Sequence, residues 1–161
     1  MGQCIAVVSG KGGTGKTSFT AGVGAALALS GLRVLCVDCD IGLRNLDIAL
    51  GLSDAALMDF SDVAQQRCTL ERAVVAHPQL AKLSLLTAPI RQRGQPVTGE
   101  QMASLLRAVR MQYDFCLLDA PAGLGDGFLL ATAAADRCVV VTTADASSLR
   151  DAQHTVMELG R

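Results

Sequence analysis

The sequence predicts an α/β fold: a mainly parallel β-sheet flanked by helices on both faces. The first observation is that short apolar runs alternate with helix-like segments, at residues 3–8, 33–38, 83–87, 114–119 and 137–142. The second is that some of these runs are apolar at nearly every position, which is typical of strands buried on both faces of a parallel sheet. We therefore expect right-handed crossover connections and a single domain over residues 1–161.

The segments between the apolar runs predict the helices. We expect them at residues 16–30, 57–66, 70–75, 126–134 and 148–159, with a further helix beginning after Thr98. Residues 16–30 are almost wholly small and apolar, which predicts burial. Thr98 with Gln101 forms a capping box, and the spacing of Ser148 and Asp151 makes Ser148 the predicted N-cap of the last helix.

Composition restricts the class of protein. The chain is 50% hydrophobic with no Trp and one Tyr, so we expect an aliphatic core. Its net charge of −1 argues against nucleic acid as a partner, because nucleic-acid binding requires a basic patch. No apolar run is long enough to span a membrane, and residues 1–8 lack the features of a signal peptide, so we expect a cytoplasmic protein.

Residues 9–17, Ser-Gly-Lys-Gly-Gly-Thr-Gly-Lys-Thr, predict a phosphate-binding loop. They lie between an apolar run and a helix, and they match the pattern G-x-x-x-x-G-K-[ST]. Glycine N–H groups can surround a phosphate, and the helix adds its positive end. We expect Lys16 to bind the β- and γ-phosphates and the Thr17 hydroxyl to bind Mg²⁺. The predicted nucleotide-binding residues are Gly10, Lys11, Gly12, Gly13, Thr14, Gly15, Lys16, Thr17 and Ser18.

Three aspartates lie at the ends of two buried runs. Asp38 and Asp40 follow one run, and Asp119 ends another. Ligands in open α/β sheets bind beyond the carboxyl ends of the strands, so we expect these carboxylates beside the phosphate-binding loop. A carboxylate in that position can hold Mg²⁺ through water. The predicted Mg²⁺ site is Thr17, Asp38 and Asp119, and Asp40 is expected to position the attacking water.

The loop contains a second lysine, Lys11, which a plain phosphate-binding loop does not need. The doubled-lysine form resembles the deviant Walker A motif of the MinD/ParA family of P-loop ATPases. In that family the first lysine crosses a dimer interface to the partner's nucleotide, as an arginine finger supplied in trans does, and such fingers are worth ~10³–10⁵ in rate. The resemblance implies an ATP hydrolase that binds ATP and Mg²⁺, with Lys11, Lys16 and Asp40 as its catalytic residues.

Three further segments resemble the same family, and most closely its MinD group of septum-site-determining ATPases. They read Asp-Ile-Gly-Leu-Arg-Asn-Leu-Asp at 40–47, Asp-Ala-Pro-Ala-Gly at 119–123 and Ser-Ser-Leu-Arg-Asp at 147–151. The last resembles a stretch at the family's nucleotide-dependent dimer face. The alternatives are a flagellar-number regulator or a ParA-type partitioning ATPase within the family, and a non-catalytic nucleotide-binding scaffold outside it.

The resemblance also implies partners and location. Family members form a homodimer in the ATP state, act with a MinC-type inhibitor and a MinE-type activator, and cycle to the inner face of the cell membrane as peripheral proteins. They continue well past residue 161. We therefore expect this chain to be truncated, without further strands, the adenine-contacting loop and a C-terminal amphipathic helix that binds membrane lipid.

Six cysteines and two histidines are the remaining candidates. Cys36 and Cys39 are the closest pair, but they span a strand end, whereas redox pairs of this spacing lie at a helix start. We expect them to be free thiols without a redox or metal role. His77 and His154 have no partners at metal-binding or catalytic spacing.

Overall fold

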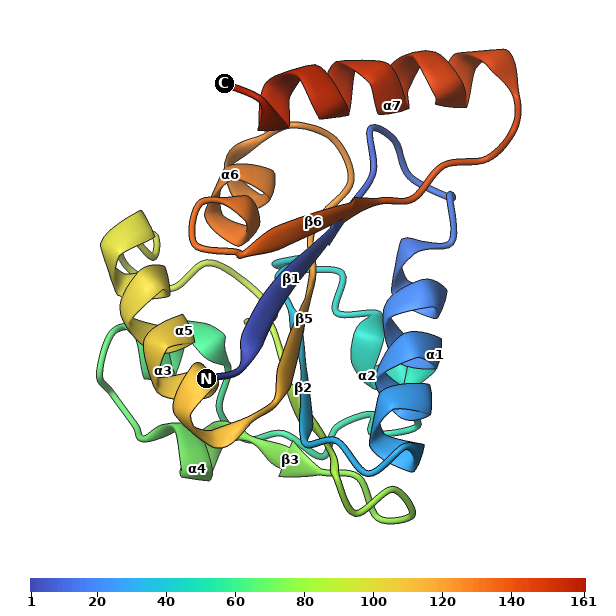
Figure 1. Cartoon of the computed structure of the whole chain (residues 1–161). Helices are drawn as coiled ribbons and strands as arrows, with labels where there is room; N and C mark the ends of the chain where they lie inside the picture. Colours follow the sequence, from blue (N-terminus) through green and yellow to red (C-terminus); the bar gives the residue numbers. More distant parts are fainter.

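The computed structural model describes residues 1–161 as a six-stranded β-sheet with helices on both faces (Figure 1). The strands are β1 (Gln3–Val8), β2 (Val34–Asp38), β3 (Val75–Ala76), β4 (Leu83–Leu86), β5 (Phe115–Asp119) and β6 (Arg137–Val140). The helices are α1 (Lys16–Leu29), α2 (Leu46–Ala49), α3 (Phe60–Ala64), α4 (Leu70–Ala73), α5 (Gly99–Gln112), α6 (Asp126–Thr132) and α7 (Ala146–Leu159).

The sheet has the strand order β3-β4-β2-β5-β1-β6. The β3–β4 pair is antiparallel, and all other neighbouring strands are parallel. Each connection between parallel strands includes a helix, so the carboxyl ends of β1, β2 and β5 meet at one edge, called the C-terminal edge below. The predicted fold, a mainly parallel sheet with helices on both faces, is confirmed.

Two apolar cores hold the helices against the sheet. Helices α3, α5 and α6 cover the larger core of 21 buried residues, which includes Phe60, Met102 and Phe128 (Figure 1). Helices α1 and α2 cover the smaller core of 10 buried residues, which includes Cys36 and Leu46. Every residue of β2 is buried, because helices cover both of its faces. Close packing on both faces fixes the positions at which the central strands end.

The predicted N-cap of the last helix is wrong. Helix α7 begins at Ala146, and its N-cap is Asp145 rather than Ser148. The Asp145 carboxylate accepts the backbone N–H of Ser148 at 3.0 Å and the Ser148 hydroxyl at 2.7 Å. A carboxylate at this position also interacts favourably with the positive end of the helix, so Asp145 caps α7 and Ser148 lies in its first turn.

The short elements between β2 and β4 differ from the prediction. The helix expected over 57–66 begins at Phe60, and the helix expected over 70–75 ends at Ala73. Strand β3 and helix α2 have no counterpart in the prediction. These elements are too short to show a periodic apolar pattern, so tertiary contacts decide their conformation.

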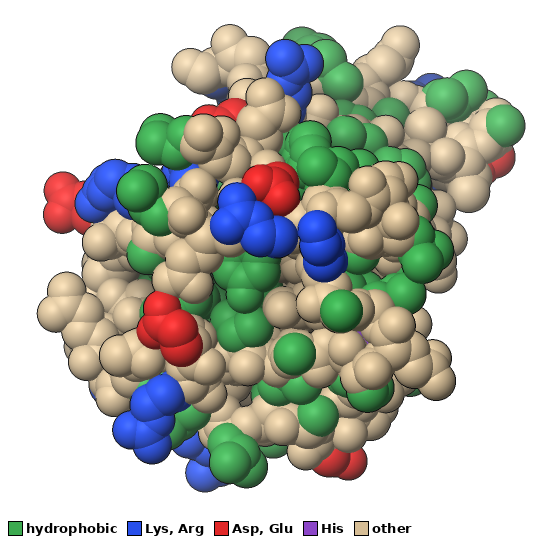
Figure 2. Space-filling model, turned by 60° about the horizontal axis from the view of Figure 1, so that its bottom comes forward, with side chains coloured by type: hydrophobic (Ala, Val, Ile, Leu, Met, Phe, Trp, Pro, Cys, Tyr) green, Lys and Arg blue, Asp and Glu red, His purple; other side chains and the backbone are tan.

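Two ion pairs lie at the opposite, N-terminal edge of the sheet, where the strands begin. Arg33 Nη2 lies 2.8 Å from Asp114 Oδ1, and Arg110 Nη2 lies 3.1 Å from Asp136 Oδ2. Each carboxylate also accepts a backbone N–H at 2.7 Å, Asp114 from Arg33 and Asp136 from Cys4. Figure 2 shows this side of the molecule, with basic and acidic side chains next to each other.

The helices and the cysteines of the chain were further points of the sequence analysis. None of the helices combines the length and hydropathy needed to cross a lipid bilayer. All six cysteines are free. Burial raises the pKa of the Cys36 thiol to about 12 and that of Cys39 well above its usual value. A buried, protonated thiol is a weak nucleophile, so both side chains serve as packing groups.

Candidate functional site

The phosphate-binding loop joins β1 to α1 at the C-terminal edge of the sheet. Gly13 and Gly15 have φ angles of 77° and 90°, a left-handed conformation that other residues rarely adopt. With the first turn of α1, the loop borders a pocket of about 270 Å³ whose lining residues are mostly polar or glycine. The lining residues are Ser9, Lys11, Gly12, Gly13, Thr14, Gly15, Lys16, Thr17, Ser18, Asp40, Leu43, Asn45 and Ala122.

Lys16, Thr17 and Asp119 come together beside this pocket. Thr17 Oγ1 donates a hydrogen bond to Asp119 Oδ2 at 2.7 Å, and Lys16 Nζ lies 3.6 Å from Asp119 Oδ1. The lysine distance gives an ion pair but is too long for a hydrogen bond. Asp119 Oδ1 is therefore a buried acceptor without a hydrogen-bond partner. Such an orphaned oxygen is uncommon in proteins, and it indicates a place where a ligand or ion completes the contacts.

Lys11 points toward the start of α7. Its Nζ donates a hydrogen bond to Ser147 Oγ at 3.1 Å and lies 3.5 Å from Asp145 Oδ1. The side chains of Lys11 and Asp145 are 38% and 53% exposed. Solvent screens an ion pair of this kind, so it stabilises the protein little. The second lysine of the loop is thus weakly held and accessible from solvent.

Asp38 and Asp40 have different surroundings, although both follow β2. Asp40 lines the pocket. Asp38 is only 1% exposed; it accepts the backbone N–H of Asp40 at 2.9 Å on Oδ1 and that of Leu46 at 3.1 Å on Oδ2. Asp40 therefore joins Lys16 and Thr17 at the pocket, whereas both oxygens of Asp38 face the backbone. A direct role for Asp38 in binding metal stays a prediction.

Burial disfavours the charged forms of these carboxylates. Burial raises the pKa of Asp38 to about 6; the two backbone N–H groups oppose this shift, and the charges of Asp119 and Asp40 add to it. Burial also raises the pKa of Asp119, although Thr17 and Lys16 act in the opposite direction. The pKa of Asp40 is raised by burial and lowered by Lys16. The C-terminal edge thus concentrates negative charge that the chain compensates only in part.

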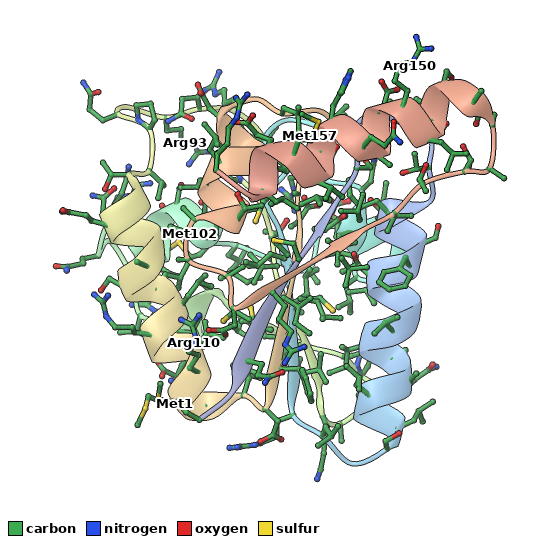
Figure 3. The ribbon with its side chains drawn as sticks, turned by 45° about the horizontal axis from the view of Figure 1, so that its top comes forward. Met1, Arg93, Met102, Arg110, Arg150 and Met157 are labelled. Atoms are coloured by element: carbon green, nitrogen blue, oxygen red, sulfur yellow. The ribbon has the colours of Figure 1, made fainter.

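Helix α7 packs directly against the phosphate-binding loop. A Cβ atom on Gly10 would lie 2.6 Å from the Asp151 carbonyl oxygen, so this close approach requires glycine. Arg150 is exposed and points away from the loop (Figure 3). In the stretch predicted to lie at a dimer face, Ser147 and Asp151 therefore contact the loop and Arg150 faces solvent.

The structure brings most of the predicted site together. The loop residues from Lys11 to Ser18 line the pocket, together with Asp40. The pocket is also lined by Leu43, Asn45 and Ala122, which are not among the predicted site residues, although the segment from Gly42 to Asn45 is expected to couple to Asp40. The available signal was their position shortly after Asp40 and Asp119, because the segments that leave neighbouring parallel strands converge at the same edge.

Comparisons with known proteins agree with this geometry. A family model described as AAA domain matches residues 2–159. The septum site-determining protein MinD of Synechocystis sp. is 41% identical over 156 residues, and that of Bacillus subtilis is 39% identical over 158 residues. Each alignment covers 97% of this chain. The chain spans 59% of the length of either relative.

The chain is also similar to solved structures of MinD proteins. The chain is similar to the MinC:MinD cell division protein complex of Aquifex aeolicus, with a TM-score of 0.89, 38% identity, and coverage of 98% of this chain and 63% of that one. It is also similar to the septum site-determining protein MinD of Pyrococcus horikoshii complexed with Mg-ADP, with a TM-score of 0.85, 31% identity, and coverage of 99% and 65%. The chain therefore belongs to the AAA domain family of P-loop proteins, and MinD proteins are among its relatives.

Proposed function

We propose that this chain is the nucleotide-binding part of a MinD-like ATPase that binds Mg-ATP, forms a homodimer and takes part in division-septum site selection. The observation that carries the proposal is the cluster of Lys16, Thr17 and Asp119 beside a glycine-rich loop. A lysine, a hydroxyl and a carboxylate in these positions are what a P-loop uses for phosphates and their magnesium. The names of the relatives support the process, and the Mg-ADP complex from Pyrococcus horikoshii supports the ligand.

The residues present fit a magnesium ion. In nucleotide sites Mg²⁺ is usually held by one or two protein oxygens together with phosphate oxygens and water. Thr17 Oγ1 and Asp119 would hold it, since Asp119 Oδ1 has no hydrogen-bond partner. When bound, Mg²⁺ neutralises charge on the β- and γ-phosphate oxygens.

The proposal gives each charged side chain a role. The loop N–H groups and the positive end of α1 bind the phosphates, and Lys16 Nζ adds a point charge beside Asp119. Asp40 orients the attacking water, and its place on the pocket wall supports this. Lys11 acts on the nucleotide of the partner subunit. Its exposed, weakly held side chain supports this role, because it can leave its contacts at little cost.

Partners and location belong to the same proposal. The MinC:MinD complex from Aquifex aeolicus supports a MinC-type partner. We infer a MinE-type activator, and cycling between the cytoplasm and the inner face of the membrane, from the family alone. Membrane contact is assigned to the part of the relatives' length that this chain does not span. The net charge of −1 favours protein partners over nucleic acid.

Calorimetric titration of the chain with ADP, with and without Mg²⁺, tests binding. We expect binding that is tighter with Mg²⁺, and its complete absence would contradict the proposal. ATP hydrolysis, measured with and without lipid vesicles and a MinE-type activator, tests turnover. Binding without turnover under every condition would favour a non-catalytic scaffold. Turnover that a MinE-type protein does not stimulate would favour a flagellar-number regulator or a ParA-type ATPase.

A further inference from the structure

The Asp38 carboxylate bonds to both ends of one short segment. This segment, residues 40–46, leads from β2 into α2. Asp38 Oδ1 accepts the N–H of Asp40 at 2.9 Å, and Asp38 Oδ2 accepts the N–H of Leu46 at 3.1 Å. Asp38 itself is the last residue of a fully buried strand and is 1% exposed. A rigid strand end therefore holds the segment at its first and last residue.

The 40–46 segment contains a strained residue and an N-cap without a side-chain bond, and its local side-chain support is the ion pair of Arg44 Nη2 with Asp47 Oδ2 at 3.3 Å. Arg44 has a φ angle of 46°, which places a residue other than glycine in the left-handed region and costs free energy. Asn45 is the N-cap residue of α2, but its side chain makes no capping hydrogen bond. Asp38, at the end of β2, instead accepts the N–H of Leu46, the first helical residue of α2, which has no partner within the helix.

The segment carries part of the candidate site. Asp40, Leu43 and Asn45 line the pocket beside the phosphate-binding loop. The carbonyls of Asn45 and Leu46 take part in the turns of α2 itself. Outside those turns, two other backbone hydrogen bonds restrain the segment, from Gly42 N–H to the Pro89 carbonyl at 3.2 Å and from Arg44 N–H to the Asp40 carbonyl at 3.3 Å. Both are longer than the bonds to Asp38, and both have a neutral acceptor. Hydrogen bonds to a charged acceptor are the stronger kind, so Asp38 is the principal restraint.

We propose that Asp38 is a positioning residue: its carboxylate clamps residues 40–46 and thereby fixes Asp40 and Asn45 against the phosphate-binding loop. Asp119 differs from Asp38, because its Oδ1 has no hydrogen-bond partner and Thr17 bonds to its other oxygen. Asp119 thus has an oxygen free to bind an ion, whereas both oxygens of Asp38 bond to the backbone. The effect on turnover rests on the proposed ATPase function, whereas the clamp itself does not.

The test replaces the carboxylate and follows the two amides that it holds. The variants are Asp38→Asn, which keeps one acceptor oxygen, and Asp38→Ala, which keeps none. Asp59→Asn is the matched control, because Asp59 Oδ1 also accepts two backbone N–H groups, from Ser61 at 2.9 Å and Asp62 at 3.2 Å. Asp59 caps α3 and does not line the pocket. Hydrogen exchange at single amides is measured by NMR on the whole chain, with and without ADP and MgCl₂.

We expect the amides of Asp40 and Leu46 to exchange at least about tenfold faster in Asp38→Ala, the loss typical of a hydrogen bond to a charged acceptor. Asp38→Asn should give an intermediate effect, and Asp59→Asn should leave both amides unchanged. Affinity for ADP without Mg²⁺ should change by less than about threefold, because the phosphate-binding loop is intact. If the chain hydrolyses ATP, Asp38→Asn should lower kcat and leave KM nearly unchanged.

Two results would overturn the clamp. One is unchanged exchange of the Asp40 and Leu46 amides in Asp38→Ala. The other is a loss of Mg²⁺ dependence in ADP binding while both amides stay protected, which would make Asp38 a metal ligand. If the unsubstituted chain binds ADP but shows no hydrolysis, the proposed ATPase function fails. The exchange measurement still decides the clamp in that case.

Discussion

The two edges of the sheet hold their carboxylates in opposite ways. At the N-terminal edge, Asp114 is bonded to the side chain and backbone of Arg33, which lowers its pKa to about 2. The Asp136 carboxylate accepts hydrogen bonds from the backbone N–H of Cys4 and from the Arg110 guanidinium, and its pKa is also lowered. At the C-terminal edge, burial raises the pKa values of Asp38, Asp40 and Asp119.

The difference separates residues that stabilise the fold from residues that serve the site. A carboxylate with a lowered pKa contributes to stability when charged, and one with a raised pKa opposes folding when charged. For Asp38, the rise in pKa from 3.8 to about 6 corresponds to a destabilisation of the folded state by about 3 kcal/mol at neutral pH. The chain retains this unfavourable charge where the strands end beside the phosphate-binding loop. Substitutions at the two edges should therefore have different consequences.

The largest expected effect is loss of nucleotide binding in Lys16→Ala. The phosphates lose a fixed positive charge that is 11% exposed and therefore poorly replaced by solvent. Calorimetry should show affinity for Mg-ADP reduced at least about 100-fold. Lys82→Ala is the control, because Lys82 is a lysine at the other edge that bonds to the Gly31 carbonyl. Unchanged affinity in Lys16→Ala would remove the phosphate-binding assignment.

Lys11→Ala should separate binding from assembly. The side chain is exposed and its ion pair is weak, so both stability and affinity for Mg-ADP should stay close to those of the unsubstituted chain. ATP-dependent dimerisation and hydrolysis should be lost, since in the proposed function both depend on this lysine acting in trans. Light scattering with ATP measures the dimer. A variant that dimerises and hydrolyses ATP normally would make Lys11 an ordinary surface lysine.

A smaller effect is expected at the N-terminal edge, and it should concern stability alone. Asp136→Asn weakens the bonds to the Cys4 N–H at 2.7 Å and to Arg110 at 3.1 Å. Denaturant unfolding should show a loss of about 1 kcal/mol, since the site is partly open to solvent. Affinity for Mg-ADP should not change. A lower affinity for Mg-ADP, measured under conditions in which both the variant and the unsubstituted chain are fully folded, would show that the two edges are coupled.

The last expected effect is a pH dependence of stability at Asp114. Its pKa falls from 3.8 to about 2 on folding, so its stabilising contribution is complete above pH 3.8 and is lost as the pH falls through 2. The destabilisation caused by Asp114→Asn should therefore be full at pH 7 and vanish near pH 2. Thermal unfolding at a series of pH values measures it. A destabilisation that stays constant down to pH 2 would exclude the ion pair as its cause.

The fold and the phosphate-binding loop could be predicted because their signals are local. Residues such as Val34, Leu35 and Val37 identify a buried strand by hydropathy alone. Lys16 and Thr17 belong to a contiguous motif whose geometry is set by the glycines and by the helix that follows. The converging strand ends then brought Asp40 and Asp119 near the loop, as general α/β topology predicts.

The remaining contacts depend on residues that are distant in sequence or on backbone conformation. Lys11 contacts Ser147, which lies 136 positions away, so no local pattern could indicate the bond. The clamp by Asp38 depends on the backbone N–H of Leu46 and on a left-handed Arg44, neither of which has a sequence signature. The predicted N-cap at Ser148 was wrong because the Asp145 carboxylate accepts hydrogen bonds from both the backbone N–H and the hydroxyl of Ser148.

The free energy of unfolding of Asp119→Asn, compared with that of Asp114→Asn, tests the difference between the two edges most directly. Without nucleotide, Asp119→Asn should be as stable as the unsubstituted chain or more stable, and Asp114→Asn should be less stable. Mg-ADP at a fixed concentration of 100 times its Kd for the unsubstituted chain should add about 2.7 kcal/mol to Asp114→Asn and much less to Asp119→Asn. An Asp119→Asn variant that is destabilised without nucleotide, and that still gains the full stabilisation from Mg-ADP, would contradict the account.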